Sequence, residues 1–318
     1  MPEQKILPVS AVIPTKDRAK ILVRTLNLLL LQSSLPKEII LVDASSTNQT
    51  ELELNGINFP KDLSVVYANA VVKGAAQQRM QGIQLATTDF IFFMDDDIIF
   101  EEGCVDRMFN GFAQGTKIGG VNAMITNQRY TPPGFVTRTM YIILSGKRLS
   151  TWAGKVVGPA WNLLPEDSPN LAQYVECEWL NTTCTIYRKE ALPDPVFPDV
   201  FKGYSLLEDV ALSITVSRNW TLLNARTARI FHDSQEDDHK QDRTYIAEME
   251  LVNRHYVMRH VLGRKGFRNY LKLFLYEMFG FVSTIISSRR AKVAIADLKG
   301  KIRALKYILR ERTGGNRI

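Results

Sequence analysis

The chain has 318 residues, of which 45% are hydrophobic and 23% are charged, an ordinary globular balance that excludes disordered and collagen-like classes. This length is enough for one large α/β domain with an appendage, or for two domains. The net charge of +7 is uneven, because residues 254–318 hold 16 Lys and Arg against three Asp and Glu, so +13 falls on this tail and −6 on residues 1–253. A basic tail on an acidic body indicates an anionic partner, either nucleic acid or an anionic membrane surface.

The first 94 residues alternate short apolar runs with helical patterns. Each apolar run is nearly continuous, and the predicted buried strands are residues 9–14, 38–43, 63–68 and 89–94. Apolar residues at helical spacing predict helices over residues 18–32 and 73–86. Such alternation predicts an α/β fold with a mostly parallel sheet that helices cover on both faces.

The second half of the chain has weaker patterns. Residues 126–175 are rich in Pro, Gly and aromatic residues without a clear period, so we expect a long, loop-rich section over the functional site. Around it, the predicted elements are a strand over 118–125, a strand leading into a turn over 177–192, a helix over 207–219 and a strand over 220–232.

Polar clusters follow three of the predicted strands, namely "TKDR" from residue 15, "DASS" from residue 43 and "DDD" from residue 95. Ligand sites in such sheets lie off the carboxyl ends of the strands. If the backbone stays extended, Asp95 and Asp97 point to the same side, where two carboxylates can bind Mg²⁺ or Mn²⁺. The alternative for "DDD" is an exposed acidic turn.

Three further candidates each have a structural alternative. Glu208 and Asp209 lie in the first turn of a predicted helix. There the helix dipole stabilises acidic side chains, so their role is either structural or that of a general base. His232 ends a predicted strand and is either structural or a third metal ligand. Arg79 lies on a predicted helix and is either a surface residue or a phosphate contact.

Six segments in order resemble the family 2 glycosyltransferases, which have the GT-A fold. They are "AVIPTKDR", "EIILVDAS", "GAAQQRMQGIQLA", "FIFFMDDDIIF", "LEDVAL" and "FH", and the resemblance runs from about residue 8 to 232. It implies an inverting enzyme of bacterial cell-surface polysaccharide synthesis that uses Mg²⁺ or Mn²⁺. Such an enzyme moves a sugar from a UDP-, dTDP- or GDP-linked donor to a hydroxyl of a glycan or lipid-linked acceptor.

The resemblance also implies a role for particular residues. The implied nucleotide-binding residues are Pro14, Thr15, Asp17, Asp43, Arg79, Asp95 and Asp96. The implied metal ligands are Asp97, Asp95 and His232. Asp209 would be the general base, with Glu208 assisting at the acceptor. The chain departs from the usual pattern in having "VDAS" in place of "VDDGS" and Met80 in place of an Asn.

The same resemblance divides the chain into two parts. Residues 1–232 would form the Rossmann-like GT-A catalytic domain, with a nucleotide-sugar-binding half over about 1–125 and an acceptor half over about 126–232. Residues 233–318 would form a basic amphipathic helical region.

Two apolar faces characterise the tail. One consists of Leu271, Phe274, Leu275, Met278, Val282 and Ile285, and the other of Ile295, Leu298, Ile302, Leu305 and Leu309. Lys272 and Glu277 interrupt the first stretch, which is then too short to span a bilayer. This pattern predicts either helices packed on the catalytic domain or attachment of residues 267–318 to an anionic membrane. Nucleic acid is not expected as a partner, because no recognition motif accompanies the charge.

The expected location is cytoplasmic and peripheral on the inner face of the cell membrane. The N-terminal segment "MPEQKILPVS" has no signal-peptide pattern, and three cysteines without a CxxC pair predict neither a disulfide framework nor a zinc site. Two other functions remain as alternatives: a non-catalytic, membrane-associated scaffold that binds nucleotide sugars, and a sugar nucleotidyltransferase. The latter would usually carry a Gly-rich phosphate loop, and "PTKDR" has no Gly.

Overall fold

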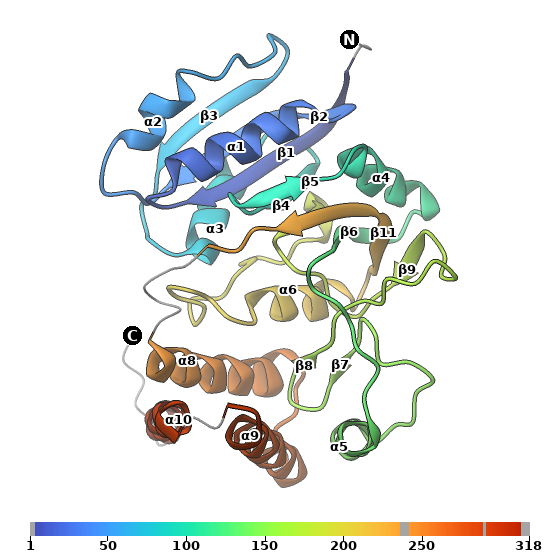
Figure 1. Cartoon of the computed structure of the whole chain (residues 1–318), viewed down its shortest axis with the longest axis vertical. Coiled ribbons are helices and arrows are strands. Elements are labelled where there is room, and N and C mark those ends of the chain that lie inside the picture. Colours follow the sequence, from blue (N-terminus) through green and yellow to red (C-terminus); the bar gives the residue numbers. More distant parts are fainter. Residues whose placement is uncertain (1–3, 236–241, 289–290, 313–318) are drawn as a thin grey trace.

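The protein is a mixed α/β structure with a central sheet (Figure 1), described here by a computed structural model for residues 4–235, 242–288 and 291–312. The strands of the sheet are β1 (Lys5–Thr15), β2 (Ser34–Asp43), β3 (Ser64–Asn69), β4 (Phe90–Met94), β5 (Ile98–Phe100), β6 (Ile118–Ile125), β9 (Tyr174–Glu176), β10 (Cys184–Arg188) and β11 (Thr221–His232). Their order is β3-β2-β1-β4-β10-β6-β11-β5, with β9 pairing to β11. Only β5, β9 and β10 run against the other strands of this sheet, so the predicted mostly parallel sheet is confirmed.

Helices cover both faces of the sheet. On one face lie α1 (Ala19–Leu30) and α4 (Cys104–Asn110), and on the other lie α3 (Ala75–Leu85) and α6 (Glu208–Val216). Successive residues of β1 alternate between the two cores, since Val9, Ala11 and Ile13 pack on the α1 side and Val12 packs on the α3 side. Burial on both faces explains why the strand sequences are almost continuously apolar.

The strand order changes direction at β1. After β1 the chain adds β2 and β3 on one side, and it then returns to add β4 on the other. Helix α3 lies very close to this point, because a Cβ at Gly82 would overlap Val12. The side chain of Gln78 can therefore donate hydrogen bonds to the carbonyl oxygens of Thr15 (2.9 Å) and Val42 (2.7 Å). A reversal of this kind is where α/β sheets bind ligands.

The section 126–175 is loop-rich, as its composition predicts, but it is not wholly irregular. It contains helix α5 (Phe135–Ser145) and a two-stranded ribbon of β7 (Val156–Val157) and β8 (Trp161–Asn162). Tyr141 and Leu144 of α5 form a separate small core with Trp152, and Tyr276 from far along the chain packs against it. The helix therefore depends on distant contacts, which a local pattern cannot reveal. The remaining short helical elements are α2 (Gln49–Leu54) and the 3₁₀ turns η1 (Gly111–Gln114) and η2 (Lys189–Ala191).

The C-terminal region consists of helices that pack on the rest of the molecule. These are α8 (Arg243–Tyr256), the π-helical turn η3 (Val257–Val261), α9 (Phe267–Ser288) and α10 (Ala291–Arg312). Helix α10 packs on α8, and α9 touches both α10 and α5. In Figure 1, α5, α9 and α10 form a layer at the end of the molecule farthest from β3. None of the described helices is long and apolar enough to cross a membrane.

Candidate active site

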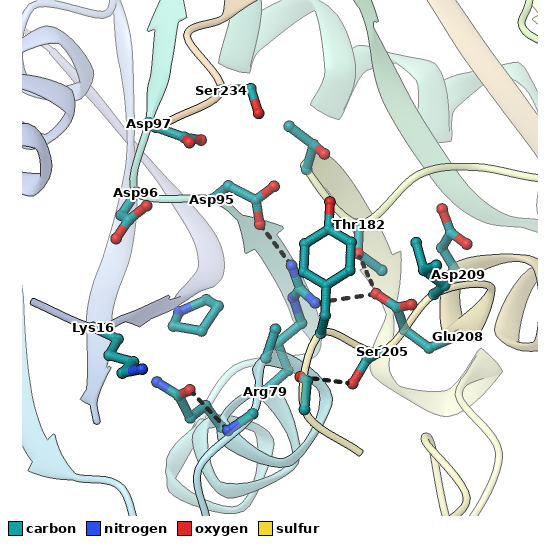
Figure 2. A pocket seen from close by; sticks show the side chains of 18 of the residues that line it. Lys16, Arg79, Asp95, Asp96, Asp97, Thr182, Ser205, Glu208, Asp209 and Ser234 are labelled. Carbon is teal, nitrogen blue, oxygen red and sulfur yellow. Dashed lines mark hydrogen bonds and ion pairs between the residues drawn. The ribbon is translucent and has the colours of Figure 1, made fainter. Parts of the chain in front are cut away.

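A cavity of about 590 Å³ opens at the carboxyl ends of β1 and β4. Segments far apart in the sequence line it, from the end of β1 to the last turn of α8. The predicted site residues that line it are Pro14, Thr15, Arg79, Asp95, Asp96, Asp97, Glu208, Asp209 and His232. Figure 2 shows Asp95, Asp96 and Asp97 on one side of this cavity, and Glu208 and Asp209 on the other. The fold thus brings most of the acids singled out in the sequence into one place.

Asp95, Asp97 and His232 form a group that suits a divalent cation. Each offers one ligand atom, and these atoms all lie within 4.8 Å of one another. His232 Nε2 lies 3.1 Å from Asp97 Oδ1 and 4.0 Å from Asp95 Oδ2. Asp97 Oδ1 is buried, and His232 Nε2 is the nearby polar atom that faces it. Two carboxylates and an imidazole are donors that Mg²⁺ or Mn²⁺ accepts, so these residues fit such an ion.

Asp97 is stabilised as a carboxylate. Burial opposes its ionisation, but the His232 ring, the backbone N–H of Gln235 and Arg18 together lower its pKa below the ordinary value. The backbone N–H of Gln235 donates to Asp97 Oδ2 at 3.3 Å, and Arg18 Nη1 lies 3.5 Å from the same oxygen. An ionised Asp97 is the form that a cation requires.

Asp96 points away from this group, toward β1. Thr15 Oγ1 donates to Asp96 Oδ2 at 2.6 Å, and Arg18 Nη1 lies 3.4 Å from Asp96 Oδ1. Burial raises the pKa of Asp96 to about 7, although the bond from Thr15 lowers it. Residues 96 and 97 form a turn, not extended backbone, and the turn still brings Asp95 and Asp97 together.

Arg79 connects the two sides of the cavity. Its Nη2 lies 2.6 Å from Asp95 Oδ1, and its Nη1 lies 3.5 Å from Glu208 Oε1. Thr182 Oγ1 donates to the same Glu208 oxygen at 3.5 Å (Figure 2). Burial, followed by the charge of Asp209, raises the pKa of Glu208 to about 8. Arg79 is therefore a buried bridge and not the surface residue that an isolated helix position would suggest.

Asp209 is only half-buried, and its carboxylate has few partners. The backbone N–H of Val210 donates to Asp209 Oδ1 at 2.7 Å, and burial raises the pKa of this carboxyl to about 6. The turn before α6 contains two non-glycine residues with positive φ, Ser205 at 57° and Leu207 at 69°. Strained backbone of this kind is concentrated at functional sites, and here it leads directly into the two acids.

Asp17 and Asp43 lie at the same edge of the sheet but do not line the cavity. Asp43 is buried and accepts hydrogen bonds from Tyr67 Oη (2.9 Å) and the backbone N–H of Ser45 (2.8 Å). Asp17 accepts from the backbone N–H of Ser46 at 2.9 Å, which lowers the pKa of its carboxyl. The two aspartates hold together the loops that follow β1 and β2.

Several lining residues were not predicted from the sequence. They include Lys16, Arg18, Gln78, Thr182, Glu250 and Arg254. Arg18 belongs to the "TKDR" cluster and could have been suggested by its place after a strand. Glu250 and Arg254 come from α8, beyond the predicted boundary of the catalytic domain, and no local pattern indicates that they reach the cavity.

Comparison with known proteins agrees with this architecture. A family profile described as "Glycosyl transferase family 2" matches residues 10–193. Comparison with curated proteins finds no significant match. Mannosyltransferase PcManGT from Pyrobaculum calidifontis, solved with GDP-Man and Mn²⁺, has a TM-score of 0.57 at 12% identity, over 94% of this chain and 87% of its own.

Two other solved structures are similar. S. aureus TarS 1–349 with UDP-GlcNAc has a TM-score of 0.54 at 16% identity, over 92% of this chain and 79% of its own. GalNAc-T7 with UDP, GalNAc and Mn²⁺ has a TM-score of 0.53 at 14% identity, over 87% of this chain but 58% of its own. At 12% to 16% identity, the similarity to these three structures shows a shared fold.

The sheet, its flanking helices and the acids at the strand ends thus define a GT-A-like glycosyltransferase. The chain belongs to glycosyltransferase family 2, whose profile covers more than half of its length.

Proposed function

We propose that the chain is an inverting, metal-dependent transferase that moves a sugar from a nucleotide-diphospho-sugar to a hydroxyl of a glycan or lipid-linked acceptor. The observation that carries this proposal is that the group Asp95, Asp97 and His232 shares one cavity with the half-buried Asp209. The donors bound by the similar structures, GDP-Man, UDP-GlcNAc and UDP with GalNAc, support a nucleotide-linked donor.

In this proposal the nucleotide-sugar half is about residues 1–125. Pro14, Thr15 and Asp96 line its side of the cavity, while Asp43 and Asp17 fix the loops beside it. Arg79 is held between Asp95 and Glu208 and would orient donor phosphate oxygens. UDP-, dTDP- and GDP-linked sugars are the donor classes to be tested.

Asp95, Asp97 and His232 would hold a Mg²⁺ or Mn²⁺ ion. When bound, such an ion neutralises negative charge that develops on a departing diphosphate. The closeness of the three ligand atoms and the lowered pKa of Asp97 both support this assignment. The neighbour solved with GDP-Man and the one solved with UDP and GalNAc both contain Mn²⁺.

Asp209 would act as the general base. Its carboxylate takes the proton of the acceptor hydroxyl while that oxygen attacks the anomeric carbon from the face opposite the nucleotide. The bond from the anomeric carbon to the diphosphate oxygen breaks as the new bond forms, so no covalent sugar–enzyme intermediate arises. A pKa near 6 leaves Asp209 ionised at neutral pH and still basic enough to accept a proton. Glu208, held by Arg79 and Thr182, would assist at the acceptor.

The proposed setting is bacterial cell-surface polysaccharide synthesis at the cytoplasmic face of the membrane. Residues 126–232 would form the acceptor half of the catalytic domain. The basic region 267–318 would contact an anionic membrane surface, where lipid-linked acceptors are found.

The experiment that tests this function is hydrolysis of a panel of UDP-, dTDP- and GDP-sugars, with and without Mn²⁺ or Mg²⁺. The wild type is compared with Asp97→Ala and with Asp62→Ala, which makes the same change at an exposed position outside the cavity lining. We expect slow, metal-dependent hydrolysis of one donor class, lost only in Asp97→Ala.

Two other outcomes would favour the alternatives. Nucleotide-sugar binding in calorimetry without turnover, with or without acceptors, would favour the non-catalytic scaffold. Pyrophosphate release from a nucleoside triphosphate and a sugar phosphate would favour the nucleotidyltransferase.

A further inference from the structure

Helix α9 presents an apolar face to solvent. Its exposed side consists of Phe267, Leu271, Phe274, Met278, Val282 and Ile285, each between 43% and 82% exposed. The opposite side packs inward through Leu273, which is buried, and Tyr276. A solvent-facing helix side of a soluble protein normally carries polar residues, so this face is the reverse of the usual pattern.

Helix α10 carries two parallel strips on its exposed side. The apolar strip is Ile295, Leu298, Ile302, Leu305 and Leu309, and the basic strip is Lys299, Arg303, Lys306 and Arg310. Members of each strip recur every three or four residues, so each strip follows one line along the helix. The two strips lie next to each other, and Ala304 and Ile308 pack inward on the other side.

Helix α5, which belongs to the expected acceptor half over about 126–232, adds further exposed apolar residues. Phe135 and Val136 are 86% and 69% exposed, and Ile143 is 48% exposed. Since α9 contacts both α5 and α10, the three helices form one continuous layer at the end of the molecule opposite β3 (Figure 1). We call the exposed apolar and basic residues of α5, α9 and α10 the basal surface.

We propose that the basal surface docks on an anionic lipid bilayer, and that α5 contacts the bilayer beside α9 and α10. This inference rests on the membrane contact proposed above and extends it beyond residues 267–318. Apolar side chains would enter the boundary between head groups and acyl chains, while the basic strip meets anionic head groups.

Charge favours a bilayer over a second copy of this chain. Residues 254–318 carry a net charge of +13 while the other 253 residues carry −6, so the positive charge is concentrated on this end of the chain. Two copies joined through the basal surface would bring two basic strips together, and like charges across an interface are unfavourable. Anionic head groups complement the strip, and an apolar patch of this extent indicates an interaction site.

Helix α8 links the basal surface to the cavity. Glu250 and Arg254 of α8 line the cavity, and Lys301 of α10 lies 3.5 Å from Glu250. Arg254 Nε also lies 3.9 Å from Glu277 of α9. A bilayer under α9 and α10 would therefore be separated from the cavity wall by a single helix layer, an arrangement suited to an acceptor carried by a lipid.

The test is flotation of the full chain with phosphatidylcholine vesicles, with and without phosphatidylglycerol. Three double variants address the three helices: Phe135→Ser/Val136→Ser in α5, Phe274→Ser/Met278→Ser in α9 and Lys299→Glu/Lys306→Glu in α10. The matched control is Leu31→Ser/Leu52→Ser, which makes the same kind of change at exposed leucines elsewhere. Folding of every variant is checked by thermal melting and by nucleotide binding in the absence of vesicles.

We expect the wild type and the control to bind the anionic vesicles and to be released by salt. Each apolar double variant should bind about ten-fold more weakly or worse, because its side chains no longer bury apolar area in the bilayer. Loss of the two lysines should weaken binding to anionic vesicles by at least about 25-fold, since each basic residue contributes about five-fold, or about 1 kcal/mol.

The outcomes separate the two proposals. An α5 variant that binds like the wild type, while the α9 variant does not, would overturn the shared surface and leave the C-terminal contact standing. A wild type that ignores anionic vesicles, or that dimerises through residues lost in the α9 variant, would overturn bilayer docking altogether. Vesicle binding by a chain that turns over no donor would support this inference and contradict the proposed transferase.

Discussion

Two glutamates that line the cavity, the buried Glu208 and the partly exposed Glu250, have pKa values shifted in opposite directions. Glu250, where α8, α9 and α10 meet, lies 3.1 Å from Arg254 and 3.5 Å from Lys301. Burial raises its pKa, but these two cations outweigh burial and lower the pKa below the ordinary value. Glu208 has Arg79 at 3.5 Å, and burial nevertheless raises its pKa to about 8.

The junction of α8, α9 and α10 and the cavity also differ in how their acids are paired with cations. In the helical junction Glu277 lies 2.6 Å from Lys301, and Asp297 has its own partner in Arg243, 3.1 Å away. In the cavity, four acids share Arg18, Arg79 and His232 for the ion pairs seen among the described residues; these acids are Asp95, Asp96, Asp97 and Glu208. Asp209 also lines the cavity but belongs to none of these pairs. Acids with raised pKa values that cluster in a cavity mark a candidate functional site, whereas acids paired one to one with cations are typical of a structural junction.

The largest effect is expected from Asp209→Asn. The amide cannot take a proton, so sugar transfer should fall about 1,000-fold while the affinity for the nucleotide stays within about two-fold. Transfer kinetics and calorimetry measure the two quantities, with Asp62→Asn as the matched control. A variant that transfers sugar at the wild-type rate would exclude Asp209 as the base.

A smaller effect, on stability, is expected from Glu208→Gln. Burial raises the pKa of the Glu208 carboxyl from 4.5 to about 8, so the folded state binds a proton at this carboxyl more tightly than the unfolded chain does. The resulting stability is fully present below pH 4.5 and is lost as the pH rises through about 8. Gln mimics the protonated form, so the variant should exceed the wild type in free energy of unfolding by on the order of 3 kcal/mol at pH 8. Denaturant unfolding across this pH range measures the difference, and a constant difference would contradict the raised pKa.

Glu250→Gln should act in the opposite direction. Since the pKa of Glu250 is lowered, its stabilising effect is present at neutral pH and is lost as the pH falls through the lowered value. The variant should be less stable than the wild type by about 2 kcal/mol at neutral pH, with the deficit shrinking in acid. The same unfolding series measures it, and a variant as stable as the wild type at neutral pH would remove the contrast between the two glutamates.

The smallest effect concerns the pair Lys301 and Glu277. Both side chains are partly exposed, at 22% and 17%, so solvent screening reduces their interaction. A double-mutant cycle with Lys301→Met and Glu277→Gln should give a coupling energy of about 1 kcal/mol. A coupling energy near zero would mean that this ion pair does not stabilise the junction.

The sequence predicts those parts of the site that follow directly from buried strands. The apolar runs at residues 9–14, 38–43, 63–68 and 89–94 correspond to β1, β2, β3 and β4. The acids after β4 therefore had to lie at the carboxyl edge of the sheet, where the structure has them. Local pattern is sufficient for β1, β2 and β4 because these parallel strands are buried on both faces. The edge strand β3 was predicted to be buried, but none of its residues is, because it has a neighbour on one side only.

The contacts between distant segments could not be predicted. The apolar face of α9 follows from helical spacing, but the sequence does not say whether that face is covered, and the structure leaves it exposed. Helix α5 packs against Tyr276, more than 130 residues later, and Arg254 reaches the cavity from α8. Such contacts depend on how whole elements pack, which the spacing within one segment does not determine.

The central claim is that Asp95, Asp97 and His232 hold a divalent cation, and Mn²⁺ binding tests it most directly. Electron paramagnetic resonance would measure the affinity for Mn²⁺, with and without a nucleoside diphosphate, in the wild type, Asp97→Asn and Asp62→Asn. We predict binding that the nucleotide strengthens and that Asp97→Asn weakens at least about 100-fold, with Asp62→Asn unchanged. Equal affinity in the wild type and Asp97→Asn would contradict the claim.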